Sequence, residues 1–178
     1  MPHKEIVFKD HLIQSTLSDC LHKIVGNEDW IGEEVRVPET RYRWDMMFKI
    51  KNDIFVVEFD GDGHYRDSLL IRNDIEKDKI AYSLGYITVR IPYFVQLTNE
   101  TLWHFFRLKA DIKQDFPHGF IKSKIFPASF CRLGLMRFEK EMSSLPKNIN
   151  TCITESLKNA AKIYGEQYVF DTISLNIN

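Results

Sequence analysis

Two apolar segments separated by three polar residues constrain the fold of this 178-residue chain most strongly. Met46-Met47-Phe48 and Ile54-Phe55-Val56-Val57 lie on either side of Lys51-Asn52-Asp53, a pattern that predicts a β-hairpin. Asp45 opens the first apolar run and Glu58 closes the second, so antiparallel pairing brings both acids to one edge. Carboxylate oxygens that converge in this way are the ligands that Mg²⁺ prefers. The sequence therefore predicts a magnesium site at this edge of the hairpin.

The composition is that of a soluble globular protein, with 44% hydrophobic and 28% charged residues and enough length for one full core. Its three cysteines form no CxxC pair, which predicts neither a disulfide framework nor a structural zinc site. The N-terminus lacks the order of a signal peptide, and no apolar run approaches the roughly 20 residues that span a bilayer. We therefore expect a cytoplasmic protein without a membrane partner.

The charges are distributed unevenly, although the formal net charge is only -1. Residues 58–78 contain seven acids and three bases, whereas residues 104–140 contain eight bases and three acids. An acidic cluster and a basic segment together suit a metal site that acts on a polyanion. Two ordinary solvated surfaces would give the same pattern, and the sequence leaves both interpretations open.

The periodicity of apolar residues predicts the element order α-β-β-β-α-β over the first two thirds of the chain. The expected ranges are a helix at 9–25, strands at 34–37, 43–50 and 54–60, a helix at 68–84 and a strand at 86–91. A further helix is predicted over 98–112, without a capping box because Glu or Gln is missing at its third position. Residues 153–164 predict another helix. We divide the chain into a core of residues 1–113 and an accessory, mainly helical lobe of residues 114–178.

Five short segments between about residues 31 and 95 carry a family resemblance. They are Arg43-Trp44-Asp45, Glu58-Phe59-Asp60-Gly61-Asp62-Gly63-His64, residues 72–78, Gly85-Tyr86 and Val89-Arg90-Ile91-Pro92. Their order resembles the PD-(D/E)XK nuclease superfamily, most closely the branch of very short patch repair endonucleases and their homing-endonuclease relatives. The resemblance implies a restriction-endonuclease-like α/β core, in which a mixed sheet is flanked by helices. It also implies a Mg²⁺-dependent endonuclease, with Mn²⁺ as a substitute, that hydrolyses double-stranded DNA in restriction, homing or repair.

The resemblance assigns roles to several residues of this sequence. Asp45 takes the place of the family's first metal-binding aspartate, and Glu58 that of the acid in the E-x-K element. Asp60 stands where that element has its lysine. We treat Asp60 and the Phe59 carbonyl as candidate metal ligands, with a turn-forming aspartate as the alternative for Asp60. His64 is the candidate for proton transfer because an imidazole ordinarily titrates near ~6.5, and a loop histidine with one hydrogen bond is the alternative.

Lys77 is the candidate replacement for the missing lysine. It lies on a helical stripe with Asp74, between apolar ends at Leu70 and Leu84, and this stripe could point into the site. A rival stripe is at least as good a core face and would turn Lys77 outward. Its members are Ile71, Ile75, Asp78 and Tyr82.

Four cations are candidate DNA contacts: Arg90, Lys122, Lys124 and Arg132. Arg90 lies inside a predicted strand and either contacts phosphate or pairs with Asp74 or Asp78. In the lobe, phenylalanines interleave with cations, which suits backbone contact and base stacking but also the packing of an ordinary helical lobe. Cutting both strands of a palindrome would favour a homodimer.

Two hypotheses from other classes remain beside the nuclease. The first is a nucleic-acid-binding module that keeps the nuclease fold without activity, and the second is a subunit that acts only inside a complex. The joint presence of Asp45, Glu58, Asp60 and His64 favours the active enzyme.

Overall fold

The chain forms two compact units. A computed structural model describes residues 5–120 and 124–170. The first unit comprises the described residues up to Asp60 together with Arg72–Asp115. The second comprises Gly61–Ile71 together with the described residues from Phe116 onward. The chain thus leaves the first unit directly after Asp60 and returns to it at Arg72.

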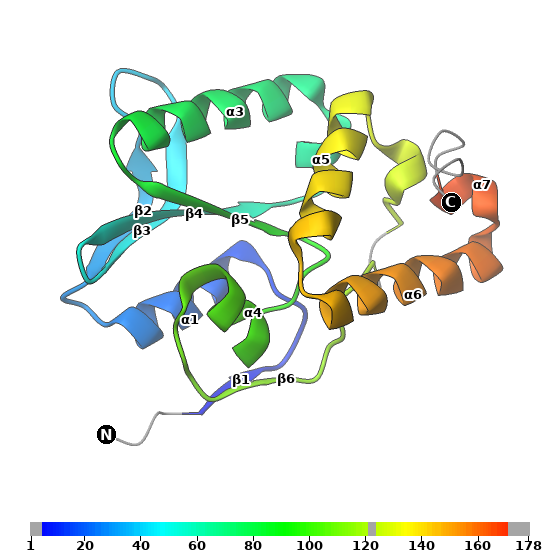
Figure 1. The fold of residues 1–178 in the computed structure, drawn as a ribbon, viewed down its shortest axis with the longest axis horizontal. Helices are drawn as coiled ribbons and strands as arrows, with labels where there is room; N and C mark the ends of the chain where they lie inside the picture. The colour runs from blue at the N-terminus through cyan, green and yellow to red at the C-terminus, as the bar shows by residue number, and fades with distance from the viewer. Residues whose placement is uncertain (1–4, 121–123, 171–178) are drawn as a thin grey trace. The chain divides into compact units, whose positions relative to one another are not determined.

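A four-stranded mixed sheet is the centre of the first unit (Figure 1). In spatial order its strands are β2 (Trp30–Arg36), β3 (Arg43–Ile50), β4 (Asp53–Asp60) and β5 (Ile87–Pro92). The first three are antiparallel, and β5 runs parallel to β4. The predicted hairpin is confirmed, but Ile50 pairs with Asp53, so its turn contains only two residues. Lys51 adopts the left-handed conformation (φ 58°) that a tight hairpin turn of this length requires.

One face of this sheet is covered by two helices, α1 (Gln14–Val25) and α4 (Asn99–Phe106) (Figure 1). Phe48 is fully buried there, with its ring centroid 5.8 Å from that of Phe55 and 5.7 Å from that of Phe106 on α4. Burial of side chains of this size stabilises the unit by about 2 kcal/mol each. The predicted α/β class, with a mixed sheet flanked by helices, is confirmed.

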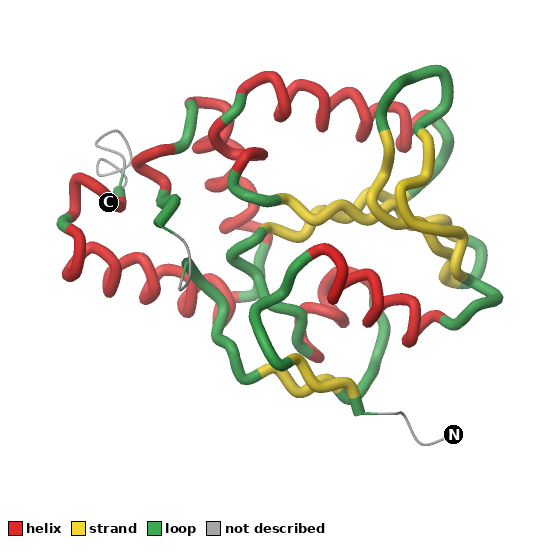
Figure 2. Tube along the Cα trace, turned by 180° about the vertical axis from the view of Figure 1, so that it is seen from behind, coloured by secondary structure: helices red, strands yellow, loops and turns green. Residues whose placement is uncertain are grey.

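A second, two-stranded sheet lies beyond these helices (Figure 2). It pairs β1 (Ile6–Phe8) in parallel with β6 (Ile112–Gln114). The sequence predicted neither strand, because three residues are too few to show a β-sheet period. The prediction of a helix from residue 9 was also wrong at its start. Leu12 lies ahead of α1 and donates its backbone N–H to the side chain of Gln96 at 2.8 Å.

Helix α4 is shorter than the predicted 98–112. Arg107 adopts a left-handed conformation (φ 57°) and donates its N–H to the carbonyl of Trp103, which ends the helix. Its start does carry a capping box, contrary to the prediction. Thr98 Oγ1 accepts the N–H of Thr101 at 3.2 Å, and Thr101 Oγ1 accepts the N–H of Thr98 at 2.7 Å. A threonine hydroxyl therefore does here what Glu or Gln does in the usual motif.

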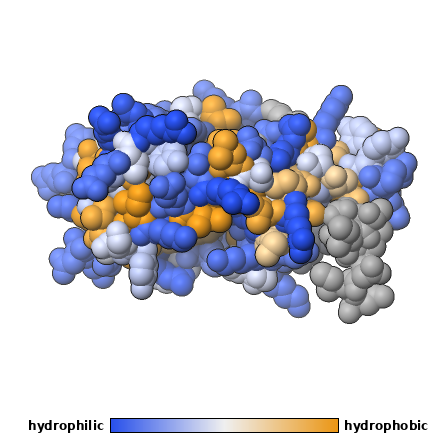
Figure 3. Space-filling model, turned by 90° about the horizontal axis from the view of Figure 1, so that it is seen from above, coloured by the Kyte–Doolittle hydropathy of each residue, from blue (hydrophilic) through white to orange (hydrophobic). Residues whose placement is uncertain are grey.

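The opposite face of the sheet is covered by α3 (Ser68–Ser83) (Figure 1). Apolar packing occupies one part of this face, where Trp44, Met47 and Val56 meet Ala81 of the helix. The side of α3 that points away from the sheet carries exposed apolar residues. Figure 3, which looks down on it, shows hydrophobic side chains among hydrophilic ones.

The second unit is helical, as predicted for the C-terminal part. Its elements are α2 (Gly63–Arg66), η1 (Pro127–Ser129), α5 (Arg132–Ser144), α6 (Lys147–Tyr164) and α7 (Glu166–Val169). Helix α6 contains the predicted 153–164 segment and begins directly after Pro146. Helix α5 was not predicted because Gly134 reads as a break. A Cβ at Gly134 would lie 1.8 Å from the Tyr65 carbonyl oxygen, so glycine is what allows α5 to approach α2.

The phenylalanines of the second unit form its core. Phe120 and Phe130 are buried, and the ring of Phe138 packs at 6.1 and 5.9 Å from them, respectively. Tyr65 of α2 stacks on Phe130 at 5.0 Å. Of the two interpretations of these aromatic residues, ordinary packing is therefore the one that accounts for Phe130.

Among the residues that the structure describes, no helix has both the length and the apolar character needed to cross a membrane.

Candidate active site

Asp45 and Glu58 meet at the open end of the hairpin. The β3–β4 register pairs Met46 with Val57, and one further step places Asp45 opposite Glu58. At that step the Asp45 side chain bonds to β4: its Oδ2 accepts the Phe59 N–H at 2.8 Å. The predicted convergence of the two acids at one edge is therefore present in the backbone register. Glu58 is buried, and Asp45 is half-buried.

Lys77 reaches Glu58 from helix α3. Its Nζ lies 2.6 Å from Glu58 Oε1 and 2.7 Å from Oε2, and its side chain is 10% exposed. The stripe that contains Asp74 and Lys77 is thus the one that faces the sheet, with Ala81 fully buried. Two members of the rival stripe face outward, since Ile75 is 44% exposed and Tyr82 84% exposed, whereas Ile71 is buried. Lys77 therefore lies beside the second acid, and its role as replacement for the lysine missing at residue 60 stays a prediction.

Arg90 is surrounded by carboxylates. The β4–β5 register pairs it with Glu58, and its guanidinium binds Asp60 at 2.9 Å, Asp74 at 3.4 Å and Asp78 at 2.9 Å. The pairing that the sequence offered as the alternative to phosphate contact is therefore present. Only 12% of the arginine side chain is exposed, and its predicted contact with DNA stays a prediction.

Asp60 is also fixed by this arrangement. Its carboxylate is fully buried, and its backbone carbonyl accepts the N–H of Tyr93 at 2.9 Å. The carboxylate is thus anchored on Arg90, whereas the predicted ligand roles of Asp60 and of the Phe59 carbonyl stay predictions. Asp74 and Asp78 complete the cluster. The sequence offered both as partners of Arg90, and it also placed Asp74 on the helical stripe that could point into the site.

The cluster carries more negative than positive charge. Its five carboxylates face two cations, which leaves three formal negative charges. The carboxylates are Asp45, Glu58, Asp60, Asp74 and Asp78, and the cations are Lys77 and Arg90. An excess of this kind in a largely buried place is unfavourable unless a cation or a proton offsets it.

Burial and the neighbouring charges shift the pKa values of Glu58, Asp45 and Arg90. Burial raises the pKa of Glu58 to about 7, and the charge of Asp45 adds to the rise while Lys77 and Arg90 lower it. Burial also raises the pKa of Asp45, partly offset by the hydrogen bond from the Phe59 N–H and by the charge of Lys77. For Arg90 the carboxylates outweigh burial and leave its pKa raised. Perturbed groups gathered in one place are typical of functional sites.

Both oxygens of the Glu58 carboxylate face the Lys77 ammonium, which lies 2.6 Å from Oε1 and donates to Oε2 at 2.7 Å. Glu58 is therefore paired, and what favours a further cation is the excess negative charge of the whole cluster. A carboxylate oxygen is also a preferred ligand for a hard divalent cation. Glu58 and Asp45 therefore fit a metal ion such as Mg²⁺ or Mn²⁺.

His64 lies in α2, in the second unit. Helix α5 fixes this short helix: Arg137 lies 5.0 Å from the centre of the Tyr65 ring, and the Tyr65 hydroxyl donates to Glu141 at 2.6 Å. Arg137 also donates to the His64 carbonyl at 3.4 Å. The sequence gave no signal for these supports, because they join residues more than 70 positions apart. The catalytic role of His64 stays a prediction.

Two of the predicted DNA contacts lie on the surface of the second unit. Lys124 is exposed, and Arg132 is exposed as the first residue of α5. Lys122 falls outside the described residues. Contact of these side chains with DNA stays a prediction.

Comparison with known proteins adds no relative. No family model, no curated protein and no solved structure matches this chain. The resemblance to PD-(D/E)XK nucleases therefore rests on the motifs, and the interpretation of the site rests on its own geometry.

Proposed function

We propose that this protein is a metal-dependent endonuclease that hydrolyses phosphodiester bonds in double-stranded DNA. The observation that carries the proposal is the convergence of three groups. Asp45 lies close enough to Glu58 for its charge to raise the pKa of Glu58, one step beyond the Met46–Val57 pair, and Lys77 contacts Glu58 at 2.6 Å. Two acids and a lysine are the functional set of the PD-(D/E)XK motif, and here the lysine comes from a helix. The element order and the mixed sheet agree with the restriction-endonuclease-like core that the resemblance implies.

Asp45 and Glu58 are the residues that would hold the metal ion. The excess negative charge of the cluster supports this assignment. When bound, Mg²⁺ supplies a Lewis acid for the phosphate and lowers the pKa of a coordinated water. Asp60 serves this site through Arg90, which ties the end of β4 to α3.

Lys77 and His64 have separate tasks in the proposed reaction. The Lys77 ammonium offsets negative charge that develops on the phosphoryl oxygens, and its ion pair with Glu58 holds it in place before substrate arrives. His64, four residues after Asp60 in the chain, would take a proton from the attacking water or give one to the leaving oxygen. Exposed Lys124 and Arg132 would contribute phosphate contacts.

The test is cleavage of supercoiled plasmid by the purified protein in Mg²⁺, in Mn²⁺ and in EDTA, compared with Asp45→Asn. We expect metal-dependent cleavage by the wild type and a loss of at least about 100-fold in the variant. Asparagine can still accept the Phe59 N–H, so the hairpin should persist. Asp53→Asn is the matched control, because Asp53 is an exposed acid at the other end of the same hairpin and should retain activity.

Two results would contradict the nuclease. Binding of DNA without cleavage, indifferent to Mg²⁺ and to Asp45→Asn, would indicate a binding module with a nuclease fold. An absence of both binding and cleavage would indicate a subunit that acts inside a complex.

A further inference from the structure

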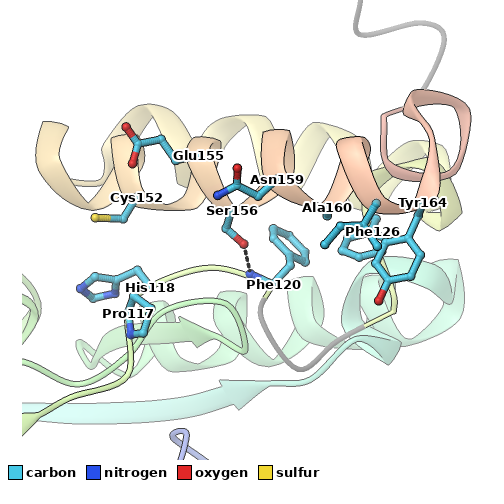
Figure 4. A pocket seen from close by; sticks show the side chains of 11 residues that line it. Pro117, His118, Phe120, Phe126, Cys152, Glu155, Ser156, Asn159, Ala160 and Tyr164 are labelled. Atoms are coloured by element: carbon cyan, nitrogen blue, oxygen red, sulfur yellow. Dashed lines mark hydrogen bonds between the residues drawn. The ribbon is translucent and has the colours of Figure 1, made fainter.

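The second unit contains a groove of about 360 Å³ beside helix α6 (Figure 4). One wall is a stripe of α6 that runs from Cys152 to Tyr164, and the other includes Pro117, His118 and Phe120. The wall is fixed in its middle, because Ser156 Oγ accepts the Phe120 N–H at 2.8 Å. A cavity of this size accommodates a small planar ligand.

The two ends of the groove differ in character. Phe126 and Tyr164 line one end, with ring centroids 5.7 Å apart, and Tyr164 is 47% exposed. Ile163, 73% exposed, also lines the groove. An exposed aromatic ring among apolar neighbours is a surface on which a flat ring can stack.

The other end is polar, and Glu155 is the one acid among the described lining residues. His118 and Cys152 lie across from each other there (Figure 4), and the amide of Asn159 lines the groove one to two turns further along α6. The imidazole of His118, the hydroxyl of Ser156 and the amide of Asn159 contain both hydrogen-bond donors and acceptors. Such groups match the edge of a heterocycle that carries ring nitrogens, carbonyl oxygens and amino groups.

The cations of α6 lie outside the lining. No lysine or arginine is among the described lining residues, and the Glu155 carboxylate disfavours a phosphate inside the groove. Lys158 and Lys162 are exposed on α6, each next in sequence to a lining residue, and their i,i+4 spacing places them on one side of the helix. A ligand with a flat heterocycle and an attached anion fits both features.

We propose that this groove holds one unpaired nucleobase of a DNA strand, with Lys158 and Lys162 on the adjoining phosphates. The inference rests on the proposed nuclease function and names its substrate class, which is duplex DNA with an unpaired base. A paired base must be unstacked before it can enter, at a cost of a few kcal/mol that a bulged base largely avoids.

The experiment measures binding of two fluorescein-labelled duplexes in EDTA by anisotropy, one fully paired and one with a single bulged adenine. We expect the wild type to bind the bulged duplex at least about tenfold more tightly, since stacking on an aromatic side chain contributes at this level. Tyr164→Ala should remove this preference. Tyr168→Ala is the matched control, because Tyr168 is a 66% exposed tyrosine of α7 outside the groove, and it should keep the preference.

Asn159→Leu gives an independent second variant at an exposed position of the lining, and it should also reduce the preference. Replacement of Lys158 and Lys162 by alanine should weaken binding of both duplexes and flatten the salt dependence. Equal affinity of the wild type for the two duplexes, or equal effects of Tyr164→Ala and Tyr168→Ala, would overturn the inference.

These measurements separate the groove from the nuclease. A preference for the bulged duplex without any cleavage would support the groove and contradict the proposed enzyme. Cleavage without the preference would do the reverse.

Discussion

The two faces of the four-stranded sheet differ in the side chains that they bury, although the same strands form both. The face under α1 and α4 is mainly apolar, and its centre is a set of contacting aromatic rings around Phe48. The face under α3 is apolar only over the part where Trp44 meets the helix, and near the ends of β3, β4 and β5 it carries the charged cluster. The face under α1 and α4 stabilises the unit through burial of apolar side chains. The face under α3 retains unfavourable charge, which a metal-binding site would need.

Phe48→Ala should produce the largest loss of stability, because it empties the centre of the apolar face. We expect the free energy of unfolding to fall by about 3–5 kcal/mol, measured by urea denaturation. The exposed Tyr82→Ala is the control and should change stability by less than about 0.5 kcal/mol. A loss below about 1 kcal/mol for Phe48→Ala would contradict the assignment of this face as the main source of stability.

Lys77→Met should be the next largest change, because it leaves Glu58 buried without its cation. We expect a loss of about 3 kcal/mol at pH 8 and a smaller loss at pH 5, where the carboxylate takes up a proton. The double variant Glu58→Gln/Lys77→Met should recover part of the stability while cleavage stays absent. Additive losses in the double variant would show that the two side chains do not interact.

Glu58→Gln tests the charged face through its pH dependence in EDTA. Burial raises the pKa of Glu58 to about 7 in the folded protein, against 4.5 for an exposed glutamate, so the folded state keeps a proton that the unfolded chain releases. This contribution is complete below pH 4.5 and is lost as the pH rises through 7. Relative to the wild type, the variant should therefore gain on the order of 2 kcal/mol between pH 5 and pH 8.

The control for this pH series is the exposed Glu28→Gln, which should follow the wild type at every pH. A constant difference between Glu58→Gln and the wild type across the range would mean that Glu58 titrates as an exposed acid.

Thr98→Ala should have the smallest effect of the four. It removes the hydroxyl that accepts the Thr101 N–H at the start of α4, on the apolar side of the sheet. We expect a loss of about 1 kcal/mol in thermal or urea unfolding. Thr151→Ala is the control, since that exposed hydroxyl bonds the Lys147 carbonyl within α6 and caps no helix. Equal effects of the two changes would argue against the capping box.

Local pattern was sufficient for much of the first unit. Two apolar runs and a short polar turn predicted the hairpin, although the turn contains two residues instead of the expected three. Helix α3 begins at the predicted residue and ends one residue early. In the second unit the sequence pattern did not predict α5, because it treats Gly134 as a helix break. In the structure this glycine permits a close contact with Tyr65, which is not a local property of the sequence.

The sequence by itself determined which residues share a strand or a helical stripe, because the periods of 2 and 3.6 are properties of the local backbone. Only the tertiary structure decided which stripe faces inward. That choice placed Lys77 against Glu58 and turned Tyr82 to solvent, although the rival stripe was the more apolar of the two. It also chose the carboxylates of α3 and β4 as the partners of Arg90. Burial and charge pairing depend on residues distant in the chain, and a local pattern contains no record of them.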